Sequence, residues 1–294
     1  MANAQMTSIG LDALPPPQMA GKAEQVGLTK SGLDAATTFA LAVLAGAFIA
    51  LGAAFATTTT TGGGAMPYGV ARLLGGLTFS LGLILVIVAG AELFTGNNLI
   101  VMAWASRRVT TLRVARNWTI VYVGNFVGAV ATAGIVYAGK QYEFAHGAVG
   151  EQALTIAAAK TNLGFVQAIA LGALCNALVC LAVWLCYSAR TTADKVLSII
   201  PPIAAFVAVG FEHSVANMYF IPYALFVKGN ESFVSSLPQP APDLSNLAWG
   251  SFFADNLLPV TIGNVIGGAV MVGAVYWFVY LRKRKPITDS GSGA

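Results

Sequence analysis

The sequence has few charged residues, and this scarcity indicates the class of protein. Only 10% of the 294 residues are Asp, Glu, Lys or Arg, whereas 56% are hydrophobic and the mean hydropathy is +0.72. A soluble domain usually carries about 25% charged residues. Several apolar stretches reach the roughly 20 residues that a helical membrane span needs. The sequence therefore predicts an integral membrane protein in a lipid bilayer.

Residues that carry chemistry are also scarce. The chain has three cysteines and two histidines. Cys175, Cys180 and Cys186 lie in one apolar run without a metal-binding or redox spacing, so we interpret them as buried small residues. The sequence has no nucleotide-binding loop, nucleophile elbow or metal-ligand cluster, and no basic cluster interleaved with stacking aromatics. We therefore expect no enzyme, cofactor, metal or nucleic-acid partner.

One pattern occurs twice, each time inside a long apolar run. Residues 90–97 read GAELFTGN and residues 210–217 read GFEHSVAN, so Gly, Glu and Asn occupy the same positions in both. Gly loosens a helix, and a carboxylate deep in an apolar run is costly. Two such interruptions in register predict paired broken helices, which mark the binding site in transport proteins built from inverted repeats.

A second match extends the repeat. The pattern G-N-x-x-G occurs at residues 124–128 and again at residues 263–267. Three spans in each half would place the two halves in opposite orientations. The predicted fold is an all-α membrane protein of six transmembrane helices in two inverted three-helix repeats, with the second and fifth helices broken. The expected spans are about 36–57, 68–104, 117–138, 162–188, 195–227 and 256–281.

The basic residues predict the orientation. Six spans place both termini on one side, and most Lys and Arg residues fall on that side, including the connection 105–116 and the terminal RKRK. Because positive charge is retained inside the cell, both termini are predicted to be cytoplasmic and the protein to lie in the inner membrane. Residues 1–35 are expected to be an amphipathic segment at the membrane face, 36–283 the transmembrane domain, and 284–294 a cytoplasmic tail.

Two polar residues at the breaks are candidates for contact with a solute. His213 is the only histidine in a predicted span, and intramembrane ionisable residues are functional candidates by default. Since imidazole changes charge near neutral pH, His213 is a candidate proton donor to a weak-acid anion. The alternative is a histidine satisfied by backbone carbonyls within the bundle. Thr95 places a hydroxyl in the first break, where it could bind a small solute.

The acidic and amide residues of the two breaks favour a structural role. Glu92 and Glu212 each follow a break, where backbone N–H groups are unsatisfied. A carboxylate there can accept hydrogen bonds from these groups and complement the positive helix end. We favour this role over proton carriage. Asn97 and Asn217 are expected to satisfy freed backbone groups in the same way.

The two motifs at residues 90–97 and 210–217 resemble the signature motifs of the formate/nitrite transporter family. The resemblance covers about residues 15–283 and includes MPYGVARLLGG, FSLGLIL, LCNALVCLAVW and PVTIGNVIGG. It implies an aquaporin-like fold, a homopentamer, and one pore in each protomer for small monovalent anions such as formate, nitrite and hydrosulfide.

The resemblance also implies roles for individual residues. Thr95 and His213 would form the central polar pair of the pore. Lys160 would draw anions to the outer mouth, and Asn176 and Asn264 would line the pore. The implied periplasmic constriction consists of Leu93, Phe94, Val179 and Phe206, and the implied cytoplasmic constriction consists of Phe79, Leu83 and Ala216.

Formate is the preferred substrate in this interpretation, because TTGGGAMPYGVARLLGG and FSLGLIL resemble formate members of the family. Nitrite and hydrosulfide remain alternatives, since ELFTGN is not typical of one substrate. A neutral-solute pore of the aquaporin type lacks the expected paired Asn-Pro-Ala motifs. A membrane scaffold or sensor would leave the two breaks and the midplane histidine unexplained. The residues leave open whether passage is channel-like or proton-coupled.

Overall fold

The protein is all-helical over the residues that the computed structural model describes, 13–238 and 241–283. Six helical segments are long and apolar enough to cross a membrane, which confirms the expected number. The third and sixth begin earlier than predicted. Thr110 caps the third, where its hydroxyl accepts a hydrogen bond from the Arg113 N–H. The segments are Ala35–Thr60, Tyr68–Gly90, Thr111–Ala138, Phe165–Ser188, Thr192–Val209 and Trp249–Tyr280.

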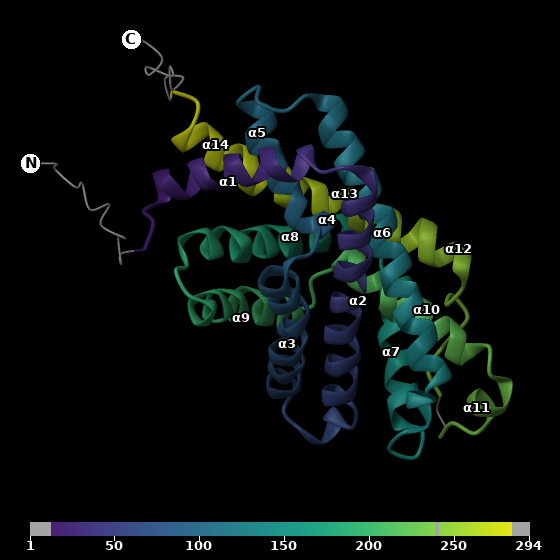
Figure 1. The fold of residues 1–294 in the computed structure, drawn as a ribbon. Coiled ribbons are helices and arrows are strands. Elements are labelled where there is room, and N and C mark those ends of the chain that lie inside the picture. The colour runs from purple at the N-terminus through teal and green to yellow at the C-terminus, as the bar shows by residue number, and fades with distance from the viewer. Residues whose placement is uncertain (1–12, 239–240, 284–294) are drawn as a thin grey trace, which may run out of the picture.

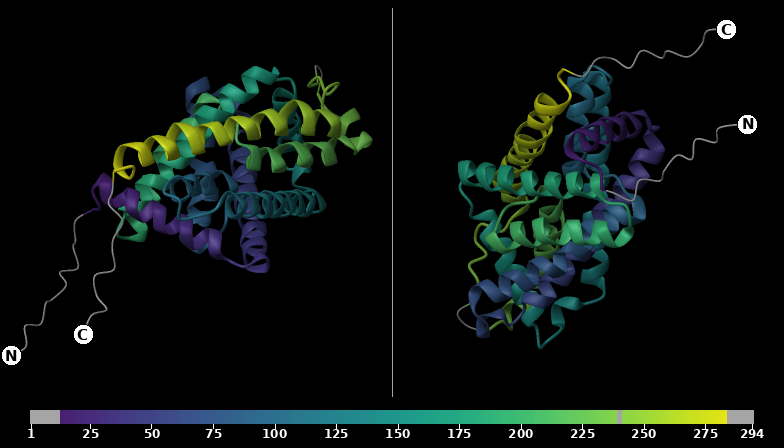
Figure 2. Two further views of the ribbon diagram at one scale, coloured as in Figure 1. Left: turned by 90° about the horizontal axis from the view of Figure 1, so that it is seen from above. Right: turned by 90° about the vertical axis from the view of Figure 1, so that its left-hand side faces the viewer.

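Two helical hairpins extend from the centre of the molecule in different directions (Figure 1). One joins α2 (Ala35–Thr60) to α3 (Tyr68–Leu85), and the other joins α8 (Phe165–Ser188) to α9 (Thr192–Val209). The hairpins meet where α3 packs against α9. In the right-hand view of Figure 2, the α8–α9 hairpin lies across the front of the molecule.

Two close helix crossings occupy matching places in the two halves. In α6 (Thr111–Ala138), a Cβ added at Gly128 would overlap the carbonyl oxygen of Val43 in α2. A Cβ added at Gly267 would overlap the carbonyl oxygen of Ala173 in α8. Membrane helices use small residues to bring backbones together in this way. The glycines of the two G-N-x-x-G patterns therefore set the spacing of α2 against α6 and of α8 against the last span.

The chain leaves helical geometry at both predicted breaks. A π-helical turn, η2 (Val86–Gly90), follows α3, and α9 ends at Val209. Gly90 and Gly210 have φ values of +82° and +89°, a region that glycine enters at low cost. After three extended residues, helical structure resumes at Phe94 in α4 (Phe94–Asn97) and at Ser214 in α10 (Ser214–Lys228).

Two shorter helices precede the halves. α1 (Pro16–Gly32) comes before α2, and α7 (Ala148–Thr161) comes before α8. One face of α1 packs against α5 (Val101–Ala105), α8 and α14 (Val275–Tyr280). The predicted N-terminal segment is thus a docked helix from Pro16 onward, whereas residues 1–12 and the predicted tail 284–294 lie outside the described residues.

The remaining elements are short turns and the segments of the last span. These are η1 (Gly63–Ala65), η3 (Asn98–Ile100), η4 (Gln141–Glu143), α11 (Glu231–Ser235), α12 (Trp249–Ser251), η5 (Phe252–Leu257), α13 (Leu258–Val265) and η6 (Ile266–Ala274).

Candidate functional site

Each break carries a partly buried ion pair between its glutamate and a lysine from the short helix before its half. The Lys30 Nζ of α1 lies 2.6 Å from Glu92 Oε1, and the Lys160 Nζ of α7 lies 2.7 Å from Glu212 Oε1. Both carboxylates are 5% exposed. Because an isolated buried carboxylate is costly, the two lysines supply the compensating charge.

An asparagine on each side joins this ion pair to the half-helix that follows. Asn97 Nδ2 donates to Glu92 Oε2 at 2.6 Å, and Asn217 Nδ2 donates to Glu212 Oε2 at 2.7 Å. The amides of Asn117 and Asn256 close the networks in the same manner, because each accepts from that asparagine and donates to the backbone oxygen of the corresponding lysine.

The freed helix N–H groups have partners other than the predicted ones. Phe94 N donates to Asn125 Oδ1 and Ser214 N donates to Asn264 Oδ1, each at 2.9 Å. The carboxylates of Glu92 and Glu212 are engaged by lysine and asparagine instead. The prediction that the Glu and Asn side chains of the breaks satisfy freed backbone groups was therefore wrong. A carboxylate beside a lysine gains more than one beside a helix end.

The two halves differ at the centre of the site. The hydroxyl of Thr95 lies 3.0 Å from Nε2 of His213, and both side chains are buried. In the aligned signatures, Leu93 stands opposite His213 and Val215 stands opposite Thr95. The repeated scaffold thus carries one polar pair, contributed by one residue from each half.

The hydrogen bonds of His213 define its tautomer. Nδ1 accepts from the Ala216 N–H at 3.0 Å, so the ring caps the N-terminus of α10. A nitrogen that accepts carries no proton, which places the ring proton on Nε2, next to the Thr95 hydroxyl. In this arrangement the ring is neutral and presents a hydrogen-bond donor at the centre of the site.

A cavity of about 380 Å³ leads to His213 from the side of Lys160. We call it the Lys160 cavity. Phe79, Phe206 and Phe220 line it, with ring centroids of Phe79 and Phe206 5.6 Å apart. The Lys160 Nζ lies 5.5 Å from the centre of the Phe220 ring. This cavity combines a wide polar rim with an apolar wall beside the histidine.

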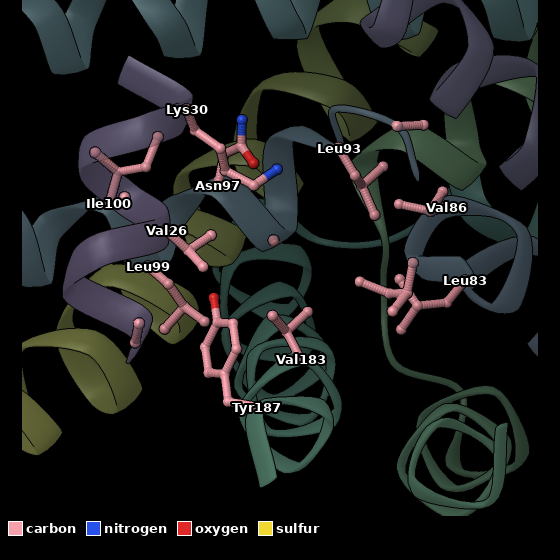
Figure 3. A pocket seen from close by; sticks show the side chains of 15 residues that line it. Val26, Lys30, Leu83, Val86, Leu93, Asn97, Leu99, Ile100, Val183 and Tyr187 are labelled. Carbon is pink, nitrogen blue, oxygen red and sulfur yellow. The ribbon is translucent and has the colours of Figure 1, made fainter. Parts of the chain in front are cut away.

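A second, smaller cavity of about 40 Å³ lies beside Lys30, and we call it the Lys30 cavity. Figure 3 shows Lys30 and Asn97 on one side of it and Leu83, Val86 and Leu93 on the other. Because one bound water needs a cavity of at least about 10–15 Å³, the Lys30 cavity admits only a few waters. The site is therefore much narrower on the Lys30 side than on the Lys160 side.

Most of the expected constriction residues line one of the two cavities. Leu83 and Leu93 line the Lys30 cavity, whereas Phe79, Phe206 and Ala216 line the Lys160 cavity. The expected grouping put Leu93 with Phe206 and Leu83 with Phe79, and it stays a prediction, because a residue at a constriction need not line the cavity on the same side. Two further expected residues, Phe94 and Val179, are buried in the core and line neither cavity.

The two asparagines expected as pore liners are structural in this arrangement. Asn264 Nδ2 donates to the backbone oxygens of Gly172 and Glu212, and its Oδ1 accepts from the Ser214 N–H. Asn176 Nδ2 lies within hydrogen-bond distance of the Thr95 backbone oxygen and of Asn98 Oδ1. Neither Asn264 nor Asn176 lines the two cavities. Their amides instead fix the half-helices that carry Thr95 and His213.

The most important residue that the sequence analysis did not single out is Lys30. A signal for it exists, because Lys-x-x-Leu occurs at residues 30–33 and again at 160–163, each time ahead of a half of the repeat. Recognising this third match would have paired Lys30 with Lys160. The partners Asn117 and Asn256 carry a signal as well, because each stands seven residues before the first Gly of the G-N-x-x-G pattern in its half.

Comparison with known proteins decides the family. Residues 17–278 match the profile of the formate/nitrite transporter family. The chain belongs to this family. It is 45% identical over 274 residues to the formate channel FocA of Escherichia coli K12, covering 92% of this chain and 96% of that one. FocA of Haemophilus influenzae is 39% identical over 273 residues, with 92% and 95% covered.

A solved structure agrees with this assignment. A pentameric formate channel with formate bound is similar to this chain with a TM-score of 0.79 and 46% sequence identity. The match covers 84% of this chain and 98% of that chain. The resemblance found in the sequence is thus confirmed, as is the all-helical, multi-pass membrane fold of this transporter family.

Proposed function

We propose that the protein conducts small monovalent weak-acid anions, chiefly formate, through a pore in each protomer of a homopentamer. It would lie in the inner membrane with both termini in the cytoplasm, as the distribution of basic residues predicts. The two halves would have opposite orientations, so that the Lys160 cavity opens to the periplasm and the Lys30 cavity to the cytoplasm. The relatives described above, which are named formate channels, support the choice of formate.

One observation carries the proposal. Two cavities, each lined by the lysine of a Lys–Glu ion pair, lie next to the Thr95–His213 pair: the Lys160 cavity reaches His213, and the Lys30 cavity is lined by Gly96, the neighbour of Thr95 in the chain. Apolar side chains line both cavities, with Phe79 and Phe206 in the Lys160 cavity and Leu83 and Leu93 in the Lys30 cavity. This combination of positive charge, apolar lining and a central polar pair favours the passage of a small anion and disfavours that of cations.

The cost of passage lies in the apolar narrowings. An anion that leaves water for an apolar surrounding without new hydrogen bonds loses several kcal/mol of solvation. The Thr95 hydroxyl and the His213 Nε2–H can replace part of this solvation at the centre. A weak-acid anion has a second route, because a proton makes it neutral and removes most of the cost.

The proposal includes transient protonation of the anion beside His213. A neutral ring does not readily give up its last proton, so the ring can serve as an acid only after Nδ1 takes a proton as well. Nδ1 must first release the Ala216 N–H that it accepts in this structure. Proton coupling therefore requires the N-terminus of α10 to loosen, whereas anion passage past a neutral ring does not.

Anion flux into proteoliposomes tests the proposal. The purified wild-type protein should carry formate, and nitrite and hydrosulfide should be compared at equal concentration, with glycerol as a neutral solute. Native mass spectrometry of the same preparation should give five chains. A protein that passes glycerol but no anion is a neutral-solute pore, and one that passes nitrite or hydrosulfide faster than formate assigns a different substrate.

His213→Asn tests the protonation step. Asn is a good helix N-cap and can accept the Ala216 N–H, so the variant should fold and assemble. It cannot titrate near neutral pH, so the pH dependence of formate uptake between roughly pH 5 and 8 should flatten. His213→Phe should close the pore at every pH. If His213→Asn matches the wild type at each pH in both directions, protonation at this ring plays no part.

A further inference from the structure

The Lys160 cavity has an imbalance of charge that Lys160 does not explain. Its charged lining residues are Arg72, Lys160 and Glu212. Lys160 and Glu212 form an ion pair at 2.7 Å, so their charges compensate each other. Arg72 makes no ion pair with a carboxylate in the part of the chain that the structure describes. The net positive charge of this cavity therefore belongs to Arg72.

Backbone oxygens hold Arg72 in place. Its Nε donates to the backbone oxygen of Ala208 at 3.2 Å, and its Nη2 donates to that of Val207 at 2.5 Å. These oxygens belong to the last turn of α9, the negative end of the helix dipole. The two bonds fix the guanidinium and use two of its five N–H groups, which leaves donors for another acceptor.

The opposite mouth has no counterpart of this residue. In the aligned repeats, residue 72 of α3 corresponds to Thr192 of α9, which carries no charge. Lys30 is the charged residue that lines the Lys30 cavity, and Glu92 compensates it. The two mouths therefore share the lysine–glutamate pair and differ in one uncompensated cation. The cavity with this cation is also the larger one, with room for an anion that keeps part of its hydration shell.

We propose that Arg72 is an anion-recruiting residue, which holds a small monovalent anion in the Lys160 cavity before it passes Phe79 and Phe206. The proposal rests on the anion conduction proposed above and assigns its first binding position. The ligand is any compact anion with oxygen acceptors, such as a carboxylate, because a guanidinium with free N–H groups offers paired donors to such groups. Lys160, held by Glu212, serves mainly to neutralise the break.

Four substitutions at two positions vary the charge of the cavity in steps. Arg72→Gln removes the charge, and Arg72→Lys retains it with weaker bonding to α9. Gln152 lines the same cavity and donates to Thr60 Oγ1 at 3.3 Å. Substitution of Gln152 by Glu or Lys introduces a negative or a positive charge there and leaves Arg72 unchanged. Gln152→Glu should act like Arg72→Gln, and Gln152→Lys should act in the opposite direction. Lys140→Gln is the control, since Lys140 is exposed and paired with Glu143 away from the cavity.

The readout is formate flux in proteoliposomes at sub-saturating formate, with a large impermeant anion setting the ionic strength. At about 0.01 M salt, loss of a unit charge about 4 Å from the bound anion should lower flux about five-fold or more. Arg72→Lys should lose less flux than Arg72→Gln because it keeps the charge but not the paired donors, Lys140→Gln should remain close to the wild type, and Gln152→Lys should exceed it. At about 1 M salt, where the Debye length is about 3 Å, the differences should disappear.

Three results would overturn the proposal. Arg72→Gln could match the wild type at low salt, could lose the same fraction at both salt concentrations, or could lose no more than Arg72→Lys. If Arg72→Gln does not form pentamers, the Gln152 variants decide, and the absence of opposite, salt-dependent shifts between them refutes the inference. A wild-type protein without formate flux refutes the proposed function instead, so the two failures are distinguishable.

Discussion

The ion pair between Lys160 and Glu212 offers a quantitative test of how the breaks are stabilised. Lys160→Met removes the compensating charge and leaves Glu212, which is 5% exposed, with amide donors only. Breaking a buried pair by removing one partner typically costs about 3–5 kcal/mol, whereas replacing both partners is often nearly neutral. We therefore expect Lys160→Met to be strongly destabilising, and Lys160→Met combined with Glu212→Gln to recover most of the loss.

The Lys30–Glu92 pair provides a matched comparison. The Lys30 side chain is 27% exposed and that of Lys160 is 16% exposed, while the side chains of both glutamates are equally buried. Water can replace more of the lost partner where the site is more exposed, so Lys30→Met should cost less than Lys160→Met. The order of the two variants follows from these exposed fractions alone.

Thermal dissociation of the purified oligomer in detergent, followed by size-exclusion chromatography, measures the effect. A domain of 150–250 residues loses roughly 2–4 °C of Tm per kcal/mol, so Lys160→Met should lower the midpoint by about 10 °C. A shift below about 2 °C would contradict the reasoning. So would a double variant no more stable than Lys160→Met, because the cost would then come from lost packing and not from an uncompensated carboxylate.

Two further predictions concern the scaffold. Gly128→Ala should reduce the yield of assembled protein, since its methyl group would meet the Val43 carbonyl, whereas Gly134→Ala in the same helix meets no atom within 4 Å and should be neutral; size-exclusion profiles compare them. Asn264→Ala should destabilise the oligomer by about 2–4 kcal/mol, because the Ser214 N–H and two buried backbone oxygens lose their partners; equal midpoints for this variant and the wild type would contradict this.

The sequence predicted the spans and the breaks because both depend on local properties. A run of apolar residues long enough to cross a bilayer is recognisable without knowing its neighbours. Gly90 and Gly210 end their helices through their own backbone conformation, and the structure gives both a positive φ. The number of spans and the positions of the interruptions followed from these features.

The partners across the breaks could not be predicted in the same way. Glu92 is satisfied by a lysine 62 positions earlier in the chain, and the Phe94 N–H by an asparagine 31 positions later. Such pairs depend on how α1 and α6 pack around α4, which local propensity does not encode. The lining of the two cavities depends on packing in the same way, because Leu83 and Phe79 are one helical turn apart and yet line different cavities.

The symmetry of the scaffold separates residues that hold the fold from residues that select the solute. The hydrogen bonds of Lys30, Asn97, Asn117 and Asn125 recur around Lys160, Asn217, Asn256 and Asn264, so they serve a task common to both halves, which is to stabilise an interrupted helix inside a membrane. Such a task needs no information about the solute.

The positions at which the two halves differ do contain information about the solute. His213 replaces a leucine, Thr95 replaces a valine, and Arg72 replaces a threonine at the equivalent positions of the other half. Two of these residues meet at the centre and the third lines the larger cavity. The Lys160 side therefore presents an uncompensated cation in a cavity that reaches His213, whereas the Lys30 side presents a compensated lysine and a cavity of about 40 Å³. Substitutions at the three asymmetric positions should thus alter flux more than assembly, and those in the repeated network should do the opposite.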